Sequence, residues 1–407
     1  MYLTRKLEKE VLRLTKEFPV VCVIGVRQCG KSTMLRHILP SNFHSVSMDT
    51  PSEVSLAQKD PRGYLLNQGF PLFIDEAQNA PCLFPEIFHI IEEKKARNEP
   101  YFGLFWLSGS NKTELLKKAQ ESLAGRAVFL EMSTLSKEEI ESRDEPVFDP
   151  IFADITKRVG PTLKPHELYD KIFKGGYPEL FDHPEKNAAD FYASYIDTYI
   201  KKDVAGLIAE KSVVSFNDFV TYCAGYVGQQ FVVSNASTAL GVNVKTIVSW
   251  LTILENTGVI YFLKPYTNNT AKRLVKAPKL YFMDTGLACY LTRWLTPQQL
   301  EVGAMAGHLL ENYVVSDIVK SHYNTRTRLD CLFYYRDFNQ KEYDLLFADN
   351  SQLYPLEIKN ATNPQIPTDN PLRSLALTIP SRYLLCSRET PFISSSGKWS
   401  LLPFSIL

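Results

Sequence analysis

Apolar residues in the first third of the chain come in short runs separated by polar or amphipathic stretches. Residues 2–18 carry apolar side chains at helical spacing, and residues 20–24 are wholly apolar. A wholly apolar run is typical of a strand buried on both faces of a parallel sheet. Similar runs occupy 43–48, 71–74, 101–107 and 127–130, and a helix is expected over 31–38. Strands that alternate with helices predict a parallel α/β sheet for residues 1–135.

The rest of the chain divides into three regions by the same patterns. Residues 136–230 begin with a polar, acidic, Pro-containing stretch and continue mainly as helices, which predicts a helical linker or lid region. Residues 231–295 show a small-residue helix, a turn at Gly241 and a second amphipathic helix followed by strands, as in a winged helix. Residues 296–407 begin with a helix that contains Glu311 and continue as strands around 332–335, 343–347 and 354–358, which predicts an α/β domain.

Composition excludes only a few classes of protein. The 407 residues include 45 Lys plus Arg and 45 Asp plus Glu, so net charge does not attract the protein to nucleic acid or to a membrane. The seven cysteines are scattered and form no C-x-x-C pair, which argues against a disulfide framework or a zinc ribbon. No stretch approaches the length of a membrane span, and we expect a cytoplasmic protein with no membrane partner.

Residues 25–32 read Gly-Val-Arg-Gln-Cys-Gly-Lys-Ser and match the phosphate-binding pattern G-x-x-x-x-G-K-[ST]. The pattern lies between a predicted strand and a predicted helix, as this motif requires. Glycines let successive amide groups turn toward a phosphate, Lys31 can reach the outer phosphates, and Ser32 can offer an oxygen to Mg²⁺. The alternative is a Gly-rich turn with an incidental lysine. We predict ATP and Mg²⁺ binding by Gly25, Arg27, Gln28, Cys29, Gly30, Lys31, Ser32 and Thr33.

Two acids end the predicted strand at 71–74 and support this site. Asp75 is expected to hold Mg²⁺ on the strand beside the phosphate loop, and Glu76 to act as the general base. The alternative is that both acids cap the helix that follows Asn79. Ser110 and Asn111 follow another predicted strand and are candidates to sense the outer phosphate or position the water, unless they form an ordinary turn.

Arg126 lies just before the strand predicted at 127–130. A guanidinium there could reach a phosphate bound by a neighbouring subunit, as an arginine finger does. The alternative is a surface salt bridge. The catalytic residues predicted for the first domain are therefore Lys31, Glu76 and Arg126.

The order of these motifs resembles that of the AAA+ ATPases, and in particular a prokaryotic family that joins such a module to a C-terminal domain of unknown function. The supporting motifs are GVRQCGKS, FIDEAQ, LSGSN, SLAGR, GGYP at 175–178, YIDTYIKKDV at 195–204, KLYFMDTGLA at 279–288 and LEIKNA at 356–361. The resemblance implies ATP hydrolysis coupled to a change of shape, usually in oligomers. We therefore expect a homo-oligomer.

The second helix of the predicted winged helix could lie in a DNA major groove, with Lys245 and Thr246 on its outer face. A stretch with four cations and no acids follows, Lys272, Arg273, Lys276 and Lys279, and would suit phosphate contacts. The alternative is a packing or subunit-contact module, because the outer helix face is poor in arginine.

Three charged residues in the C-terminal region resemble the D…E-x-K site of restriction-endonuclease-like folds. Asp344 lies on one predicted strand, and Glu357 and Lys359 leave the same face of another because they are two residues apart. The carboxylates could hold a metal ion on a scissile phosphate while the lysine stabilises the developing charge, and Glu311 could add a ligand. The alternative is a silent nuclease-like domain used for docking.

Two functional hypotheses follow. In the first, the chain is an AAA+ ATPase whose hydrolysis of ATP drives a change of shape and acts on DNA. In the second, it is a nucleotide-controlled switch whose partner is another protein.

Overall fold

The computed structural model describes residues 2–110, 112, 115, 119, 122–161, 163–199, 213–267, 276–349, 351–367, 371–375, 377–394 and 398–407. These residues form two compact units. The first contains Met1–Leu135 with two short segments, Asn256–Gly258 and Tyr323–Arg326, and the second contains Ser136–Glu255, Val259–His322 and Thr327–Leu407.

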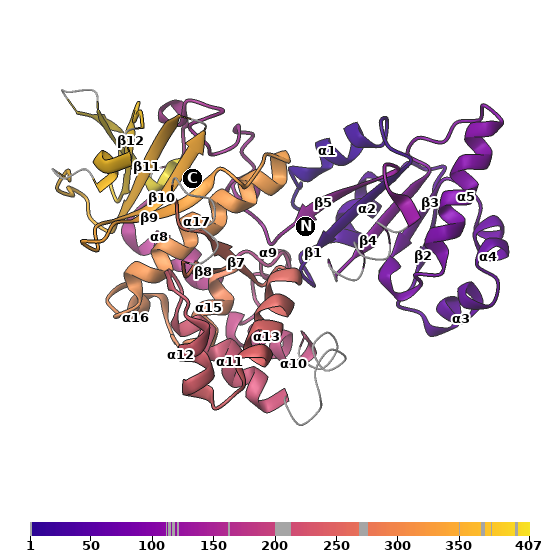
Figure 1. The fold of residues 1–407 in the computed structure, drawn as a ribbon, viewed down its shortest axis with the longest axis horizontal. Helices are drawn as coiled ribbons and strands as arrows, with labels where there is room; N and C mark the ends of the chain where they lie inside the picture. The colour runs from indigo at the N-terminus through magenta and orange to yellow at the C-terminus, as the bar shows by residue number, and fades with distance from the viewer. Residues whose placement is uncertain are drawn as a thin grey trace. The chain divides into compact units, whose positions relative to one another are not determined.

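The first unit is a five-stranded parallel sheet accompanied by helices (Figure 1). The strands are β1 (Val20–Gly25), β2 (His44–Ser47), β3 (Leu72–Asp75), β4 (Phe105–Gly109) and β5 (Ala127–Met132), and the order across the sheet is β2-β3-β4-β1-β5. The helices are α1 (Leu7–Leu14), α2 (Lys31–Ile38), α3 (Pro51–Lys59), α4 (Pro61–Gln68) and α5 (Leu83–Ala96). The apolar runs lie in the core because helices cover the sheet, and the predicted parallel sheet is confirmed.

Strand order decides which side chains can meet. β4 lies between β1 and β3, so the expectation that β3 is beside the strand of the phosphate loop is wrong. The carboxyl ends of β1, β3 and β4 still share one edge because all neighbouring pairs are parallel. A short turn, η1 (Ala77–Asn79), follows β3 at that edge.

The second unit begins with helices. They are α7 (Lys137–Ile140), α8 (Pro165–Lys174), α9 (Glu179–Asp182), α10 (Ala188–Tyr199) and α11 (Val213–Gly225), with η2 (Ile155–Lys157) between α7 and α8. Later in the chain α15 (Thr285–Leu291) and α16 (Pro297–Glu301) pack against α8.

Asp284 joins two of the motifs noted in the sequence. One carboxylate oxygen accepts the Gly176 amide at 2.8 Å, and the other accepts the Tyr192 hydroxyl at 2.7 Å and the Leu287 amide at 3.0 Å. Tyr192 is buried against Tyr177 and Phe191. The GGYP turn and the MDTGLA segment are therefore held together by one buried carboxylate.

The middle of the unit has the element order expected of a winged helix. It contains α12 (Val233–Leu240), α13 (Val244–Asn256) and a three-stranded sheet of order β6-β8-β7, built from β6 (Gln229–Gln230), β7 (Ile260–Leu263) and β8 (Lys279–Phe282). The two helices meet at 112° at a turn where Gly241 has φ of 65°, which suits a helix–turn–helix. Among the described residues no single helix has the length and apolar character of a membrane span, and α12 with α13 meets that test only as a bent pair.

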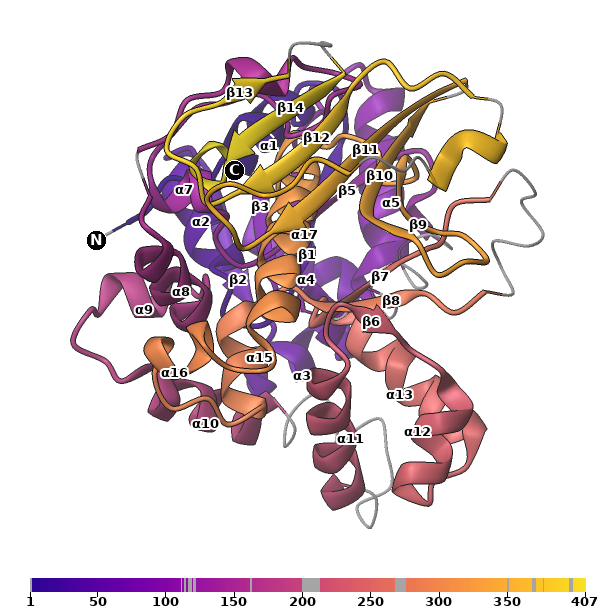
Figure 2. The ribbon, with the colours of Figure 1, turned by 90° about the vertical axis from the view of Figure 1, so that its left-hand side faces the viewer.

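The C-terminal part is a six-stranded mixed sheet with the long helix α17 (Ala306–Thr325) beside it (Figure 2). The strands are β9 (Leu332–Arg336), β10 (Glu342–Asp349), β11 (Gln352–Lys359), β12 (Arg382–Cys386), β13 (Phe392–Ile393) and β14 (Trp399–Pro403), in the order β13-β14-β12-β11-β10-β9. The predicted α/β class is confirmed, whereas β12, β13 and β14 were not expected from the sequence. Two further turns, η5 (Pro371–Leu375) and η6 (Phe404–Ile406), flank these strands.

Candidate functional site

The phosphate loop turns sharply between β1 and α2. Gly30 has φ of 94° and Gln28 has φ of 60°, so both residues adopt the left-handed region. A Cβ atom at Gly25 would lie 1.9 Å from the carbonyl oxygen of Met132, so only glycine fits there. The buried Cys29 anchors the loop because its carbonyl accepts a 2.7 Å hydrogen bond from Arg5.

Lys31 and Ser32 begin α2 and face the loop. The Lys31 ammonium donates to the carbonyl oxygens of Gly25 at 2.9 Å and Val26 at 3.0 Å. The Ser32 hydroxyl donates to Asp75 at 2.6 Å, which brings a serine oxygen and a carboxylate together at the start of the helix. Such a pair can supply oxygen ligands to a hard cation such as Mg²⁺.

Asp75 contacts side chains from several elements at this edge of the sheet. It accepts hydrogen bonds from Ser32 and from Ser108 on β4, and it pairs with Arg36 at 3.1 Å. Its carboxylate therefore faces the phosphate loop across β4. The sequence missed Arg36, because its position one turn beyond the loop identifies it only when the sheet order is known.

Glu76 leaves β3 in the left-handed region, with φ of 49°. Its carboxylate accepts hydrogen bonds from the Ser110 amide at 3.3 Å and hydroxyl at 3.0 Å, and from the Gln78 amide group. The side chain is thus directed to the end of β4, in contrast to the helix-capping alternative. Asn111 lies outside the described residues.

Gln78 is a second residue that the sequence missed. Its amide nitrogen contacts both Glu76 and Ser110, and its buried Oε1 atom accepts no hydrogen bond from the described part of the chain. A buried amide oxygen beside a carboxylate is suited to orient a water molecule. The remaining loop residues, Arg27 and Thr33, are partly exposed and exposed, respectively.

Arg126 lies at the opposite edge of the sheet from the phosphate loop. Its carbonyl oxygen accepts the amide of Val20, at the first residue of β1, whereas the loop follows the last residue. At about 3.3 Å per strand residue the separation is roughly 17–20 Å, so Arg126 cannot reach the phosphate loop of its own chain.

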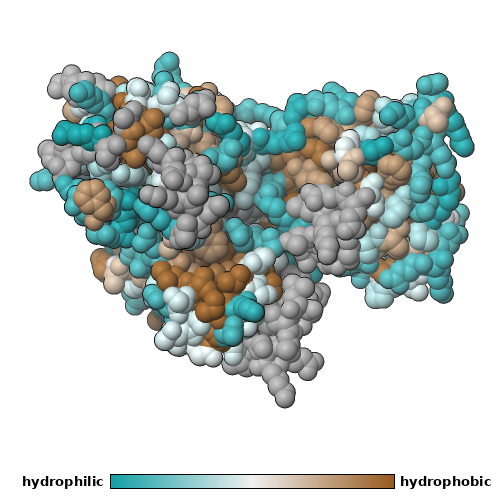
Figure 3. Space-filling view, viewed as in Figure 1, coloured by the Kyte–Doolittle hydropathy of each residue, from teal (hydrophilic) through white to brown (hydrophobic). Residues whose placement is uncertain are grey.

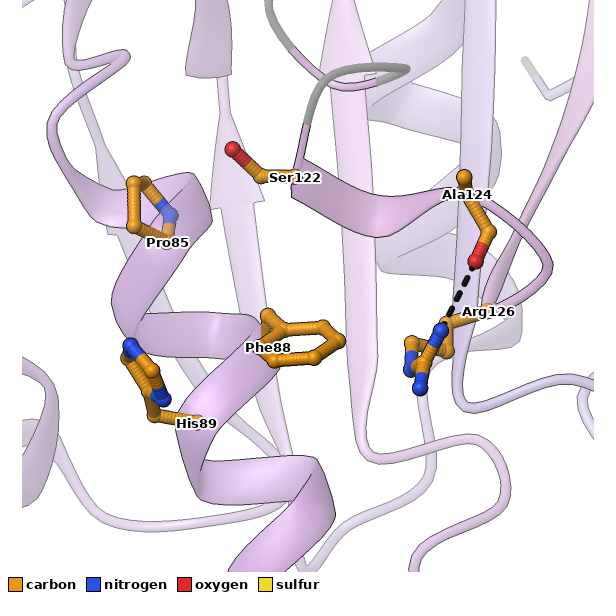
Figure 4. Close-up of a pocket in the computed structure, with 6 residues that line it drawn as sticks. All are labelled: Pro85, Phe88, His89, Ser122, Ala124 and Arg126. Carbon is orange, nitrogen blue, oxygen red and sulfur yellow. Dashed lines mark hydrogen bonds between the residues drawn. The ribbon is translucent and has the colours of Figure 1, made fainter.

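In this chain the Arg126 guanidinium binds Glu92 at 2.9 Å and lies 4.4 Å above the ring of Phe88. The hydrogen bond from Arg126 holds the pKa of Glu92 below its usual range. Figure 4 shows the guanidinium at the side of a surface pocket of about 380 Å³, between Phe88 and Ala124. The pocket is also lined by Pro85, His89 and Ser122.

A second group of charged residues lies in the C-terminal sheet and on α17. Asp344 on β10 accepts the Ile358 amide at 2.8 Å, and Glu357 on β11 pairs with Lys359 at 3.1 Å. Burial and the nearby Asp344 raise the pKa of Glu357 to about 7, with Lys359 opposing the shift. The structure thus brings Asp344, Glu357 and Lys359 within electrostatic reach of one another.

Glu311 on α17 belongs to the same group. Its carboxylate accepts hydrogen bonds from Lys279 at 2.7 Å and Tyr281 at 2.6 Å, both on β8. Burial and Asp344 raise the pKa of Glu311 to about 7, although Lys279 opposes the shift. Carboxylates held this close against their mutual repulsion are typical of sites that receive a cation.

Lys279 was wrongly assigned to the exposed basic stretch. Its side chain is buried and contacts Glu311 and Glu342, so it cannot contact a nucleic-acid phosphate at the surface. The sequence missed this role because Lys279 follows other cations along the chain and its partners come from a distant helix, α17, and a distant strand, β10.

Of the predicted DNA-facing residues the structure describes those on α13, a helix that also exposes apolar side chains. Lys245 is exposed and Thr246 half-buried on α13, while Lys272 and Arg273 lie outside the described residues. Figure 3 shows brown, apolar surface in the region labelled α12, α13 and α15 in Figure 1. Val244 and Val248, one turn apart on α13, are 47% and 48% exposed. This helix face is better suited to an apolar partner than to base edges.

Three segments of the chain match known protein families. Residues 17–141 match an AAA domain, residues 165–298 match a domain of unknown function (DUF8612), and residues 306–407 match a domain of unknown function (DUF4143). The second match spans the boundary predicted between residues 230 and 231.

Two similar full-length proteins are uncharacterized. Mb2031c of Mycobacterium bovis and Rv2008c of Mycobacterium tuberculosis are each 26% identical to this chain over 375 residues, which is 90% of this chain and 77% of the relative. Among solved structures, the Walker-type ATPase PABY2304 of Pyrococcus abyssi is similar with 13% identity and a TM-score of 0.43, covering 70% of this chain and 94% of that one. By the family matches the chain carries an AAA domain and a C-terminal domain of unknown function, the combination that its motifs predict.

Proposed function

We propose that this protein binds ATP with Mg²⁺ and hydrolyses it. The observation that carries the proposal is the convergence of Ser32, Asp75, Glu76 and Ser110 at the sheet edge that holds the phosphate loop. These residues come from α2, β3 and β4, and their order around the loop supports a hydrolysis site rather than a phosphate-binding turn alone.

Each residue has a role that its contacts support. The loop amides and the α2 N-terminus bind phosphate oxygens, and Lys31 exchanges its two carbonyl partners for the outer phosphates. Ser32 and Asp75 hold Mg²⁺, which when bound neutralises phosphate charge. Glu76 accepts the proton of the attacking water, while Ser110 and Gln78 fix the direction of its carboxylate.

The test is Glu76→Gln, which keeps the size of the side chain and removes the base. The variant is expected to bind ATP as the wild type does and to turn it over about 100- to 1,000-fold more slowly. Turnover at the wild-type rate, measured as phosphate release under saturating ATP, would remove Glu76 from the mechanism.

We further propose that Arg126 acts on the nucleotide of a neighbouring copy, because it is too far from its own phosphate loop. Two inactive variants then complement each other. Lys31→Ala retains Arg126 but lacks ATP binding, and Arg126→Ala retains ATP binding but lacks the guanidinium. Mixing them is expected to restore phosphate release, and additive residual rates at all mixing ratios would refute action between copies.

Hydrolysis is proposed to drive a change of shape that acts either on DNA or on a protein partner. ATPase assays with and without duplex DNA separate the two. Stimulation that weakens with added salt favours DNA, since phosphate contacts release counterions. Indifference to DNA favours a protein partner, as the exposed Val244 and Val248 also do.

A second activity, metal-dependent cleavage of a phosphodiester, is proposed for the C-terminal domain. The specific observation is that Asp344 accepts the Ile358 amide beside the Glu357–Lys359 pair, and that burial and Asp344 raise the pKa of both Glu357 and Glu311. Nicking of plasmid DNA with Mg²⁺ or Mn²⁺ tests it, with Asp344→Ala as the comparison. Equal nicking by both proteins, or none by either, would leave a docking role for this domain.

A further inference from the structure

A buried group of three side chains lies in the second unit, away from both sites described above. It consists of Asp149, in the segment that follows α7, His322 near the end of α17, and Cys331 just before β9. Asp149 and His322 are fully buried, and Cys331 is 1% exposed. The ligand atoms of the three residues all lie within 4.8 Å of one another.

The neighbours of this group direct its atoms inward. The Ile151 amide donates to Asp149 Oδ1 at 2.8 Å, which turns the other carboxylate oxygen toward His322 and Cys331. His322 Nδ1 lies 2.9 Å from the carbonyl oxygen of Arg328. A carbonyl has no proton to give, so Nδ1 carries the hydrogen, and in the neutral ring the lone pair of Nε2 faces Asp149.

The distance between the His322 imidazole and the Asp149 carboxylate argues against a proton shared by these two groups, and a hydrogen bond from the Cys331 thiol brings the third donor to the same carboxylate oxygen. His322 Nε2 lies 3.5 Å from Asp149 Oδ2, and Cys331 Sγ lies 3.4 Å from the same oxygen. A proton shared between an imidazole and a carboxylate would draw the two atoms to about 2.7–2.9 Å. Tetrahedral Zn²⁺, with bonds of about 2.0–2.3 Å, places its ligand atoms about 3.3–3.8 Å apart.

We propose that Asp149, His322 and Cys331 bind one Zn²⁺ ion as three of its ligands. Nitrogen, sulfur and oxygen donors together suit this ion, and a histidine whose second nitrogen is tied to a backbone carbonyl is common at zinc sites. The nearby Arg328 guanidinium pairs with Asp330 and Asp349. The proposal does not depend on ATP hydrolysis or on nuclease activity.

The ion would join two distant segments of the chain, one with Asp149 and the other with His322 and Cys331. Asp149 is 173 residues before His322, and Cys331 begins the sheet edge formed by β9. α17 also carries Glu311, and β9 pairs with β10, which carries Asp344. Zinc binding would therefore stabilise the scaffold of the carboxylate group as well as its own loop.

The experiment is zinc analysis of the full chain, purified without an affinity tag or chelator from zinc-supplemented medium. About one zinc per chain is expected in the wild type, and at least about tenfold less in Cys331→Ser, since loss of a ligand weakens binding strongly. Cys386→Ser is the matched control, because Cys386 is equally buried in the same unit, and Asp344→Ala controls for metal bound by the carboxylate group. Both controls are expected to retain zinc.

Cobalt substitution in the wild type keeps the test informative if Cys331→Ser does not fold. Co²⁺ at this site would show a sulfur-to-cobalt charge-transfer band and the intense visible bands of tetrahedral coordination, and chelation would lower the melting temperature. Folded wild-type protein without zinc and without that band overturns the proposal. Zinc that is lost in Asp344→Ala but kept in Cys331→Ser overturns it equally.

Discussion

The phosphate loop and the C-terminal carboxylate group are built in opposite ways. The loop is one contiguous string, and its geometry depends on backbone turns such as those at Gln28 and Gly30. The carboxylate group draws Glu311, Asp344 and Glu357 from a helix and two strands, and burial raises the pKa of Glu311 and of Glu357. A site formed by the backbone of one contiguous segment can therefore be recognised from its sequence motif. A site formed by side chains from separate elements can be recognised only when it is known which strands are neighbours.

If the two sites are independent, Lys31→Ala should affect only the first. Its loss removes charge-assisted hydrogen bonds to two phosphates, and ATP affinity is expected to fall more than about 100-fold, or roughly 3 kcal/mol. Calorimetric titration with ATP measures this, with the exposed Lys59→Ala as control. Unchanged Mn²⁺ binding by the C-terminal domain would complete the separation, and ATP binding at wild-type affinity would contradict the role of Lys31.

Asp344→Ala should affect only the C-terminal carboxylate group. The change removes an oxygen ligand, so Mn²⁺ affinity at the carboxylate group is expected to fall about 10- to 100-fold while ATP binding stays intact. Electron paramagnetic resonance of Mn²⁺ measures the free ion in the presence of each protein. Asp349→Ala, on the same strand but paired with Arg328, is the control and should bind Mn²⁺ normally.

Glu357→Gln should stabilise the metal-free protein at high pH. The folded-state pKa of Glu357 is raised from 4.5 to about 7, so the folded protein holds this proton more tightly than the unfolded chain. Its favourable contribution is present below the unfolded value and is lost as pH rises through about 7. The variant is expected to gain about 1–2 kcal/mol over the wild type at pH 8 and nothing near pH 4.

Urea unfolding with a chelator at both pH values measures that difference. Exposed Glu389→Gln should change stability at neither pH. An advantage of Glu357→Gln that is equal at pH 4 and pH 8 would mean that charge repulsion is not its cause.

Ser110→Ala should have the smallest effect. It removes one hydrogen bond to Glu76 but leaves the Ser110 amide and Gln78 in place, so turnover is expected to fall about three- to tenfold with ATP affinity unchanged. Phosphate release at saturating ATP measures the rate, and Ser45→Ala on the exposed β2 strand is the control. A loss as large as that of Glu76→Gln would give Ser110 a direct role in the chemistry.

Residues in a contiguous motif could be predicted from the sequence, whereas residues whose partners lie on other elements could not. Lys31 and Ser32 were predicted because they belong to the phosphate-binding pattern, and Asp75 and Glu76 because they end an apolar run. Arg36 and Gln78 were missed because their partners depend on the sheet order. Lys279 was misassigned because its neighbours in sequence are cations while its neighbours in space are Glu311 and Glu342.

Prediction of the strands from the sequence was limited in a similar way. The alternating runs of residues 1–135 predicted the parallel sheet, since its central strands β1, β3 and β4 are buried on both faces. β12, β13 and β14 were missed, because short strands at the end of a mixed sheet carry little periodic signal.

The contacts of the Asp284 carboxylate restrict where an expression fragment of this protein can start. Its two oxygens hold Gly176, Tyr192 and the first turn of α15 at once, so an expression fragment that starts at residue 231 would keep the acceptor and discard two of its donors. The discarded piece also contains the aromatic side chains packed around Tyr192. A fragment meant to isolate the middle of this protein should therefore start ahead of α8, with Asp284 and its donors on the same polypeptide.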